Sequence, residues 1–165
     1  MSRDGESNPE LNKLDRNRLG ATASRVTTLA LAWYFSGEEK YAQKATELIR
    51  VWFFDKDTRM NPNLEYAQMI PGHNGGKGRC YGVLDSYSFV EMLDAVKLLE
   101  QSKSFTAKDS KQLQAWFGKL LNWILTSPQG QEESRQANNH STAYDAQVIA
   151  IALYTGNLKV AREVI

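Results

Sequence analysis

Two stretches of the chain, ALAWYFSGEEKYAQKA (residues 30–45) and IAIALYTGNLKVAREV (residues 149–164), align with each other without a gap. Each contains an apolar helical run, an aromatic residue, Ser or Thr followed by Gly, and a second helical pattern with Lys and Ala at matching places. Self-similarity of this kind is typical of repeat architectures, in which one supersecondary unit recurs along the chain. The unit predicted here is a helical hairpin.

The rest of the sequence is also dominated by helical periodicity, and no stretch alternates strictly with period two. Gly37 and Gly156 are predicted helix stops, Thr106 with Asp109 resembles a capping arrangement, and Pro128 follows the fourth helix. We predict helices over residues 18–36, 38–54, 82–102, 107–127 and 140–155, and the start of a sixth helix at residue 158.

These helices group into hairpins that begin near residues 18, 82 and 140. Antiparallel hairpins in register predict an all-α fold that forms part of an α/α toroid, an incomplete barrel within a single domain over residues 1–165. The alternative is an ordinary helical bundle with a chance internal similarity. Because the chain stops at AREVI inside a helical pattern, without a Gly stop or a polar tail, we expect it to be a fragment of a longer protein.

The composition narrows the possible partners and locations. With 165 residues and 42% hydrophobic content the chain can bury one core, and 20 Lys+Arg against 19 Asp+Glu provide no global field for nucleic acid or an anionic membrane. The single cysteine excludes an intramolecular disulfide and a Cys-based metal site. No apolar run approaches the roughly 20 residues of a membrane span, and MSRDGESNPE lacks the apolar segment of a signal peptide.

One long non-helical segment, from Asp55 to Tyr81, contains NPNLEYAQMIPGHNGGKGRCYG. Loops of this length inside compact domains are usually functional or disordered, and Tyr66, Met69 and Ile70 favour an ordered loop. The glycine-rich run GHNGGKGR lacks the GxxxxGK[ST] spacing of a phosphate-binding loop, and no strand precedes it.

As a polar ligand loop, the same run offers donors suited to carboxylates and hydroxyl groups. These donors are His73, Asn74, Lys77 and Arg79. The alternative interpretation is a solvated flexible turn.

A second group of polar residues lies in QANNHSTAYDAQ (residues 136–147). Asn138, Asn139 and His140 come at the start of the predicted fifth helix, where free N–H groups and the positive end of the helix dipole favour an anion. Alternatively, one Asn caps the helix and His140 forms a hydrogen bond within the core. The two histidines of the chain have no acidic partners at helical spacing, so we predict no metal site.

Other chemistries have less support in the sequence. There is no G-x-S-x-G elbow, and Cys80 has no neighbouring His in the sequence, which argues against nucleophilic hydrolysis. A glycosidase pair could come from Glu65, Asp85, Glu91, Asp94 and Asp145. Trp33, Trp52, Trp116 and Trp123 recur at core spacing, so most are predicted to pack, although one or two could stack on sugar rings.

Three separated segments, NNHSTAYDAQ, WILTSPQGQEESRQ and MNPNLEYAQMIPGHNGGKGRCYGVLD, agree in order and spacing with one family. Through them nearly the whole chain resembles the alginate lyase family of polysaccharide lyases, whose helical toroids carry an Asn-His pair in an NNH motif. The resemblance implies β-elimination on alginate or a related uronic-acid polymer, without a cofactor, and a periplasmic or secreted location.

In this chemistry the sugar carboxylate is neutralised, the C5 proton is removed and the 4-O-glycosidic bond breaks. Preorganised donors must stabilise the developing dianion. The resemblance therefore implies that Asn139 neutralises the carboxylate and that His140 acts as base or as a further carboxylate partner. The predicted contacts to the anionic polysaccharide are His73, Asn74, Lys77, Arg79, Tyr81, Asn138 and Tyr144.

The sequence departs from the family pattern in two places. In the family an Arg and a Tyr from a later segment complete the site, and we do not identify that Tyr with Tyr144, one helical turn past His140. Ala143 stands where related sequences often have an aromatic residue. We therefore expect the isolated chain to be inactive, and to self-associate or fray at its last helix. The alternatives are a glycoside hydrolase on the same scaffold and a truncated, non-catalytic carbohydrate-binding domain.

Overall fold

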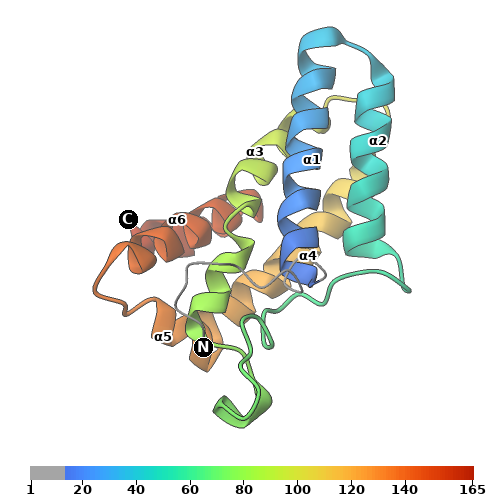
Figure 1. The fold of residues 1–165 in the computed structure, drawn as a ribbon. Coiled ribbons are helices and arrows are strands. Elements are labelled where there is room, and N and C mark those ends of the chain that lie inside the picture. Colours follow the sequence, from blue (N-terminus) through green and yellow to red (C-terminus); the bar gives the residue numbers. More distant parts are fainter. Residues whose placement is uncertain (1–13) are drawn as a thin grey trace.

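Residues 14–165 are described by a computed structural model, and in this part of the chain every regular element is a helix (Figure 1). The 3₁₀ and π elements are η2 (Arg50–Phe54), η3 (Asn74–Gly76) and η4 (Cys80–Ser86). The α-helices are α1 (Asp15–Ser36), α2 (Glu39–Ile49), α3 (Phe89–Leu99), α4 (Ala107–Thr126), α5 (Pro128–Glu133), α6 (Asn139–Tyr154) and α7 (Leu158–Val164). The all-α prediction is confirmed.

The internal repeat corresponds to two helical hairpins, α1/α2 and α6/α7. Gly37 ends α1 with φ +69° and donates its N–H to the Trp33 carbonyl, and Gly156 has φ +75° between α6 and α7. Both values lie in the left-handed region that favours glycine at a helix end, so both predicted stops are confirmed. In the expected third hairpin, α3 and α4 do not lie along each other but meet through Phe89 and Phe117. α4 begins with the predicted capping box of Thr106 and Asp109.

The hairpins lie side by side: α1 packs against α2 and α3, and α3 packs in turn against α6 (Figure 1). An aromatic cluster joins four of the elements at the centre. Ring centroids lie 4.7 Å apart for Phe53 and Trp116, 5.3 Å for Phe89 and Phe117, and 5.7 Å for Phe117 and Tyr154. Such pairs contribute about 0.5–1.5 kcal/mol beyond the area they bury, so this cluster fixes how the hairpins meet.

One predicted helix boundary was wrong, and one short helix was not predicted. The helix expected over residues 82–102 starts as the 3₁₀ segment η4, and α3 begins only at Phe89. A Cβ atom on Gly82 would lie 2.5 Å from the Ala67 carbonyl oxygen, so the chain here follows the neighbouring loop rather than helix propensity. Pro128, expected only to end a helix, also begins the next one: Ser127 accepts a hydrogen bond from the Gly130 N–H, and Pro128 occupies the first position of α5.

The long segment before η4 is ordered for a different reason than its apolar residues suggested. Tyr66 and Met69 are 66% and 45% exposed, so burial does not hold them. Instead the segment pairs with itself through backbone hydrogen bonds, from the Gly78 N–H to the Glu65 carbonyl (2.7 Å) and from the Arg79 N–H to the Ala67 carbonyl (3.1 Å). No helix between residues 14 and 165 is both long and apolar enough to cross a bilayer.

Candidate active site

The Asn-Asn-His sequence lies where α5 ends, α6 begins and η4 passes beside both helices. Asn138 is the N-cap of α6: its side-chain oxygen accepts a hydrogen bond from the His140 N–H at 2.8 Å. The Ser141 hydroxyl donates to the Asn138 carbonyl at 3.0 Å. Asn138, predicted as a substrate contact, therefore has a structural role that fixes the first turn of α6.

His140 is paired with a carboxylate that the sequence analysis did not identify. Nδ1 of His140 lies 2.6 Å from Oε1 of Glu133, the last residue of α5. The Glu133 side chain is fully buried, whereas that of His140 is 33% exposed. With the carboxylate ionised, the neutral imidazole carries its proton on Nδ1, which leaves Nε2 as the nitrogen that can accept one.

The second carboxylate oxygen of Glu133 has no hydrogen-bond partner among the residues that the structure describes, although it is buried. Buried polar atoms are rarely left without a partner, because desolvation without a hydrogen bond costs about 1–3 kcal/mol. This orphaned oxygen sets Glu133 apart from an ordinary core residue.

One residue that follows the glycine-rich run, Tyr81, contacts the imidazole, and Arg79 contacts Tyr81. The rings of Tyr81 and His140 meet edge to face, with centroids 5.0 Å apart, and the Arg79 guanidinium carbon lies 4.6 Å from the centre of the Tyr81 ring. Arg79 forms no ion pair with any described residue. The arrangement places the Arg79 guanidinium next to the Tyr81 ring, which in turn contacts His140.

Tyr81 is held in place by Gln68 and Asp85. The Gln68 side-chain amide donates to the Tyr81 carbonyl (3.3 Å) and to the Asp85 carboxylate (2.8 Å), and Arg16 of α1 forms an ion pair with Asp85 (3.0 Å). Gln68 adopts φ +54°, which is unfavourable for a residue with a side chain. These contacts therefore hold the loop in a conformation that it would not adopt alone.

Asn139, the first residue of α6, is exposed, and its side-chain amide has no hydrogen-bond partner among residues 14–165. It lies at the end of α6 where the first N–H groups have no carbonyl partner within the helix. Asn139 is thus a free donor at the positive end of a helix dipole.

The other predicted loop contacts lie farther along the loop. Lys77 forms an ion pair with Glu65 at 3.0 Å, which raises the pKa of Lys77, and the Asn74 amide donates to the Gly78 carbonyl at 2.7 Å. His73 is exposed, and no described contact connects it with His140. The structure therefore brings Tyr81 to His140 and Arg79 to Tyr81, whereas no described contact brings His73, Asn74 or Lys77 to His140.

The prediction that Tyr144 contacts substrate does not agree with its position. Its side chain is only 5% exposed, and its hydroxyl group donates to the Ile124 carbonyl of α4 at 3.4 Å. Burial raises the pKa of Tyr144 above its ordinary value. One turn into α6 the helix is already covered by α4, so Tyr144 belongs to the core.

The predicted glycosidase carboxylates are dispersed. Glu91 and Asp94 are exposed on α3, Glu65 pairs with Lys77, and Asp85 is engaged by Arg16 and Gln68. Burial raises the pKa of the Cys80 thiol to about 11, which does not favour a nucleophile. Among the described residues no group of three potential metal ligands comes together.

The whole chain, residues 1–165, matches the family described as alginate lyase. The chain belongs to the alginate lyase family. It is also similar to the crystal structure of an alginate lyase from Bacteroides ovatus, with 55% sequence identity and a TM-score of 0.95. That similarity covers 99% of this chain and 43% of that one, so the chain spans less than half the length of its structural relative. No curated protein matches the chain. The hairpins are accordingly those of a partial alginate-lyase toroid.

Proposed function

We propose that this chain carries an acid/base centre of a polysaccharide lyase that cleaves alginate or a related polyuronate by β-elimination. The main support is the pair formed by the buried Glu133 and the partly exposed His140, next in sequence to the free amide of Asn139 in a chain of the alginate lyase family. The family supports lyase chemistry in general, and the assignment of residues is our own.

In the proposed reaction a base removes the proton on C5 of the uronate. The C5–H electrons form the C4–C5 double bond, the C4–O4 bond breaks, and an acid protonates the departing oxygen. The C5 proton is only weakly acidic, so the reaction depends on donors that stabilise the negative charge that develops on the carboxylate. Asn139 at the start of α6 is such a donor, and the Arg79 guanidinium on Tyr81 is a second candidate.

His140 is the proposed proton acceptor. Its Nδ1 faces Glu133, so Nε2 is the nitrogen that can exchange a proton with the substrate. Glu133 is a positioning residue in this scheme, because it holds the ring and its tautomer without touching the sugar. Tyr81 lies against the imidazole and is the tyrosine of the described site that could protonate the leaving oxygen.

Hydrolysis on the same scaffold is less well supported. A glycosidase needs two carboxyl groups that flank the scissile bond. The carboxylate of this site, Glu133, is fully buried and engaged by His140. No described contact joins this pair to the carboxylates considered first, which are Glu65, Asp85, Glu91, Asp94 and Asp145. A non-catalytic role in binding oligouronates is the other alternative, because the chain covers only 43% of its structural relative.

Product analysis tests the reaction class. We expect the longer protein, of which this chain forms part in our interpretation, to act on alginate or glucuronan outside the cytoplasm. Each cleavage should create an unsaturated uronate with a characteristic ultraviolet absorbance. New reducing ends without that absorbance would indicate hydrolysis and would overturn the proposal. We expect the isolated 165-residue chain to bind oligouronates without turnover, because it covers only 43% of its structural relative.

A further inference from the structure

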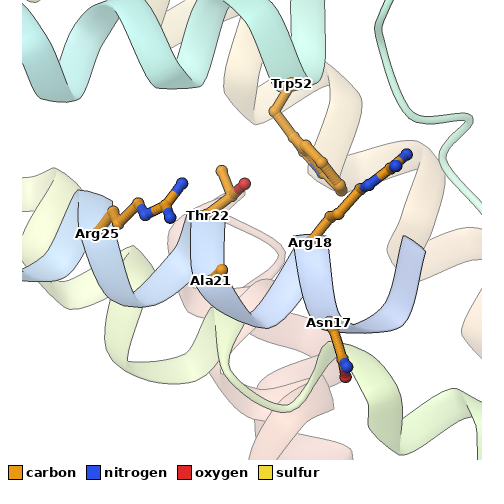
Figure 2. A pocket seen from close by; sticks show the side chains of 6 residues that line it. All are labelled: Asn17, Arg18, Ala21, Thr22, Arg25 and Trp52. Carbon is orange, nitrogen blue, oxygen red and sulfur yellow. The ribbon is translucent and has the colours of Figure 1, made fainter. Parts of the chain in front are cut away.

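A shallow pocket of about 390 Å³ lies between the first turns of α1 and the π-helical segment η2. Figure 2 shows the side chains that line it. They are Asn17, Arg18, Ala21, Thr22, Arg25 and Trp52. None of them belongs to the site around His140.

The pocket contains two guanidinium groups on one side of α1. Arg18 and Arg25 are seven residues apart, which is about 10 Å along a helix axis. In Figure 2 both side chains extend on the side of the helix that faces Trp52. Arg18 forms an ion pair with Asp15 at 3.2 Å, but both side chains are largely exposed, so the pair contributes little. Arg25 has no ion pair within the described part of the chain.

Trp52 provides the apolar wall of the same pocket. The residue is partly buried and packs in part against the core, and its indole N–H is buried without a hydrogen-bond partner among the described residues. A tryptophan in the middle of a core would be fully covered by other side chains, as Trp116 nearly is at 7% exposure. The pocket therefore combines an accessible aromatic side chain with two positive charges.

A second pocket also contains an arginine, but it does not combine a tryptophan with unneutralised guanidinium groups. It measures about 550 Å³ and includes Arg50, but that guanidinium group is bound bidentately by Asp109 at 2.8 and 2.9 Å. Its positive charge is therefore already neutralised. The pocket at the start of α1 differs from it, because its two guanidinium groups have no buried carboxylate partner among the described residues and lie beside a tryptophan.

The pocket and the His140 site lie at the same end of a row of helices. Arg16, in the first turn of α1, forms an ion pair with Asp85 of η4, and η4 carries Tyr81 to His140 in the first turn of α6. α3 lies between α1 and α6. With helix axes about 8–10 Å apart, the two sites are separated by roughly 20 Å, a span that several linked sugar units can bridge.

We propose that the pocket formed by Arg18, Arg25 and Trp52 is a distal subsite for uronate units of the polysaccharide that is cleaved at His140. This inference rests on the proposed function for the identity of the polymer. Planar guanidinium groups bind carboxylates through two parallel hydrogen bonds, and an indole ring packs against the apolar face of a pyranose. In an extended (1→4)-linked uronate chain, every second carboxylate returns to the same side, as the two guanidinium groups do on α1.

Substrates of different length test the subsite. The longer protein with His140→Gln, which should bind without turnover, is titrated calorimetrically with a mannuronate disaccharide and with a hexasaccharide. Arg25→Gln and Arg18→Gln should each weaken hexasaccharide binding by roughly tenfold or more, the usual effect of losing a hydrogen bond to a charged group. Binding of the disaccharide, which can occupy only one of the two sites, should change less. Arg162→Gln on α7, also an exposed arginine, is the matched control and should change neither.

Each outcome decides the matter. If Arg25→Gln and Arg18→Gln bound the hexasaccharide as tightly as the protein that keeps both arginines, the subsite would be overturned. Equal losses for Arg162→Gln would reduce the effect to net charge and would overturn it as well. Trp52→Leu separates sugar recognition from anion attraction, because it should weaken the hexasaccharide but not dextran sulfate. If no polyuronate is cleaved by the wild-type protein but the arginine variants still lose hexasaccharide binding, the proposed reaction fails and the subsite stands.

Discussion

Oε1 of Glu133 lies 2.6 Å from Nδ1 of His140, and the carboxylate is fully buried while the imidazole is 33% exposed. One partner therefore belongs to the core and the other to the surface of the site. The buried carboxylate therefore fixes the orientation of the imidazole that we expect to accept the proton. Substitutions at Glu133 and at His140 should therefore affect stability and turnover differently.

Glu133→Gln should lower turnover and leave the fold intact. The substitution conserves volume and removes a buried charge, so the free energy of unfolding should change little or rise. The new amide N–H can donate to Nδ1, which would move the imidazole proton to Nε2 and block it as an acceptor. We expect turnover to fall by roughly ten- to a hundredfold, the range seen when groups that orient a histidine are lost. Initial rates and the ¹⁵N shifts of His140 measure both effects, and unchanged rates would refute the positioning role.

His140→Ala should reduce both turnover and stability. Loss of a general acid or base lowers rates by about 10²–10⁴. Because Glu133 would then be a buried charge without a partner, unfolding should become easier by about 3–5 kcal/mol. The double variant Glu133→Gln/His140→Ala should recover most of that stability without recovering turnover. If denaturant unfolding shows no recovery in the double variant, the two residues are not coupled as the geometry indicates.

The two neighbouring asparagines should respond in opposite ways. Asn138→Ala removes the cap of α6 and should cost about 1 kcal/mol of stability. Asn139→Ala removes an exposed amide without a described partner, so thermal unfolding should be almost unchanged. Its turnover, however, should fall by about 10²–10³ if the amide stabilises the developing charge. A matched loss of stability in both variants would assign Asn139 to the fold instead.

Acid should destabilise the protein through Asp109. Hydrogen bonds from Arg50 are the main reason why the pKa of Asp109 falls from 3.8 to about 2. A carboxyl group with a lowered pKa in the folded state stabilises the protein above its unfolded pKa, and this contribution of about 2 kcal/mol disappears as the pH falls from about 4 through 2. Asp109→Asn should lose stability at neutral pH and flatten this part of the curve. Denaturant titrations at several pH values measure the free energy of unfolding of both proteins. If Asp109→Asn lost stability below pH 4 as steeply as the wild type does, other groups would be responsible.

Self-association of the 165-residue chain should depend on exposed apolar side chains at the turns of its first and last hairpins. Tyr34 and Phe35 at the end of α1 are 53% and 81% exposed, and Leu153 and Leu158 at the α6/α7 turn are 54% and 52% exposed. Phe35→Ser and Leu158→Ser should each lower the average mass in solution, measured by light scattering at several concentrations. The exposed Tyr66 on the long loop supplies a control, because Tyr66→Ser removes a large exposed side chain that lies at neither hairpin turn. A monodisperse wild-type chain would contradict the expectation.

The helical hairpins could be predicted because their signals are local. The repeat over residues 30–45 and 149–164 predicted turns at Gly37 and Gly156, and both are found in the left-handed conformation. The 3₁₀ start of η4 could not be predicted in the same way, because it depends on the close approach of Ala67 to Gly82. A contact between segments that are distant in the sequence overrode helix propensity there.

The site was predicted in part for a similar reason. Asn139 and His140 were singled out by the NNH motif, but Glu133 was missed because acidic partners were sought at helical spacing. The chain changes direction between α5 and α6, and this turn brings a residue seven positions earlier into contact with the imidazole. Tyr144 was predicted to contact substrate because it is close to His140 in the sequence, but the sequence did not reveal that α4 covers it.

Gly78 and Gly82 bracket the segment that brings Arg79 and Tyr81 to His140, and both press against Ala67. A methyl group on either would approach the Ala67 carbonyl oxygen to 2.2 or 2.5 Å. Neither glycine touches the imidazole, yet the smallest possible side chain at either position would push the tyrosine ring away from it. The tip of the loop is restricted in another way, because Gly72, Gly75 and Gly76 have positive φ values. We therefore expect natural variants to keep glycine at both the tip and the base of this loop.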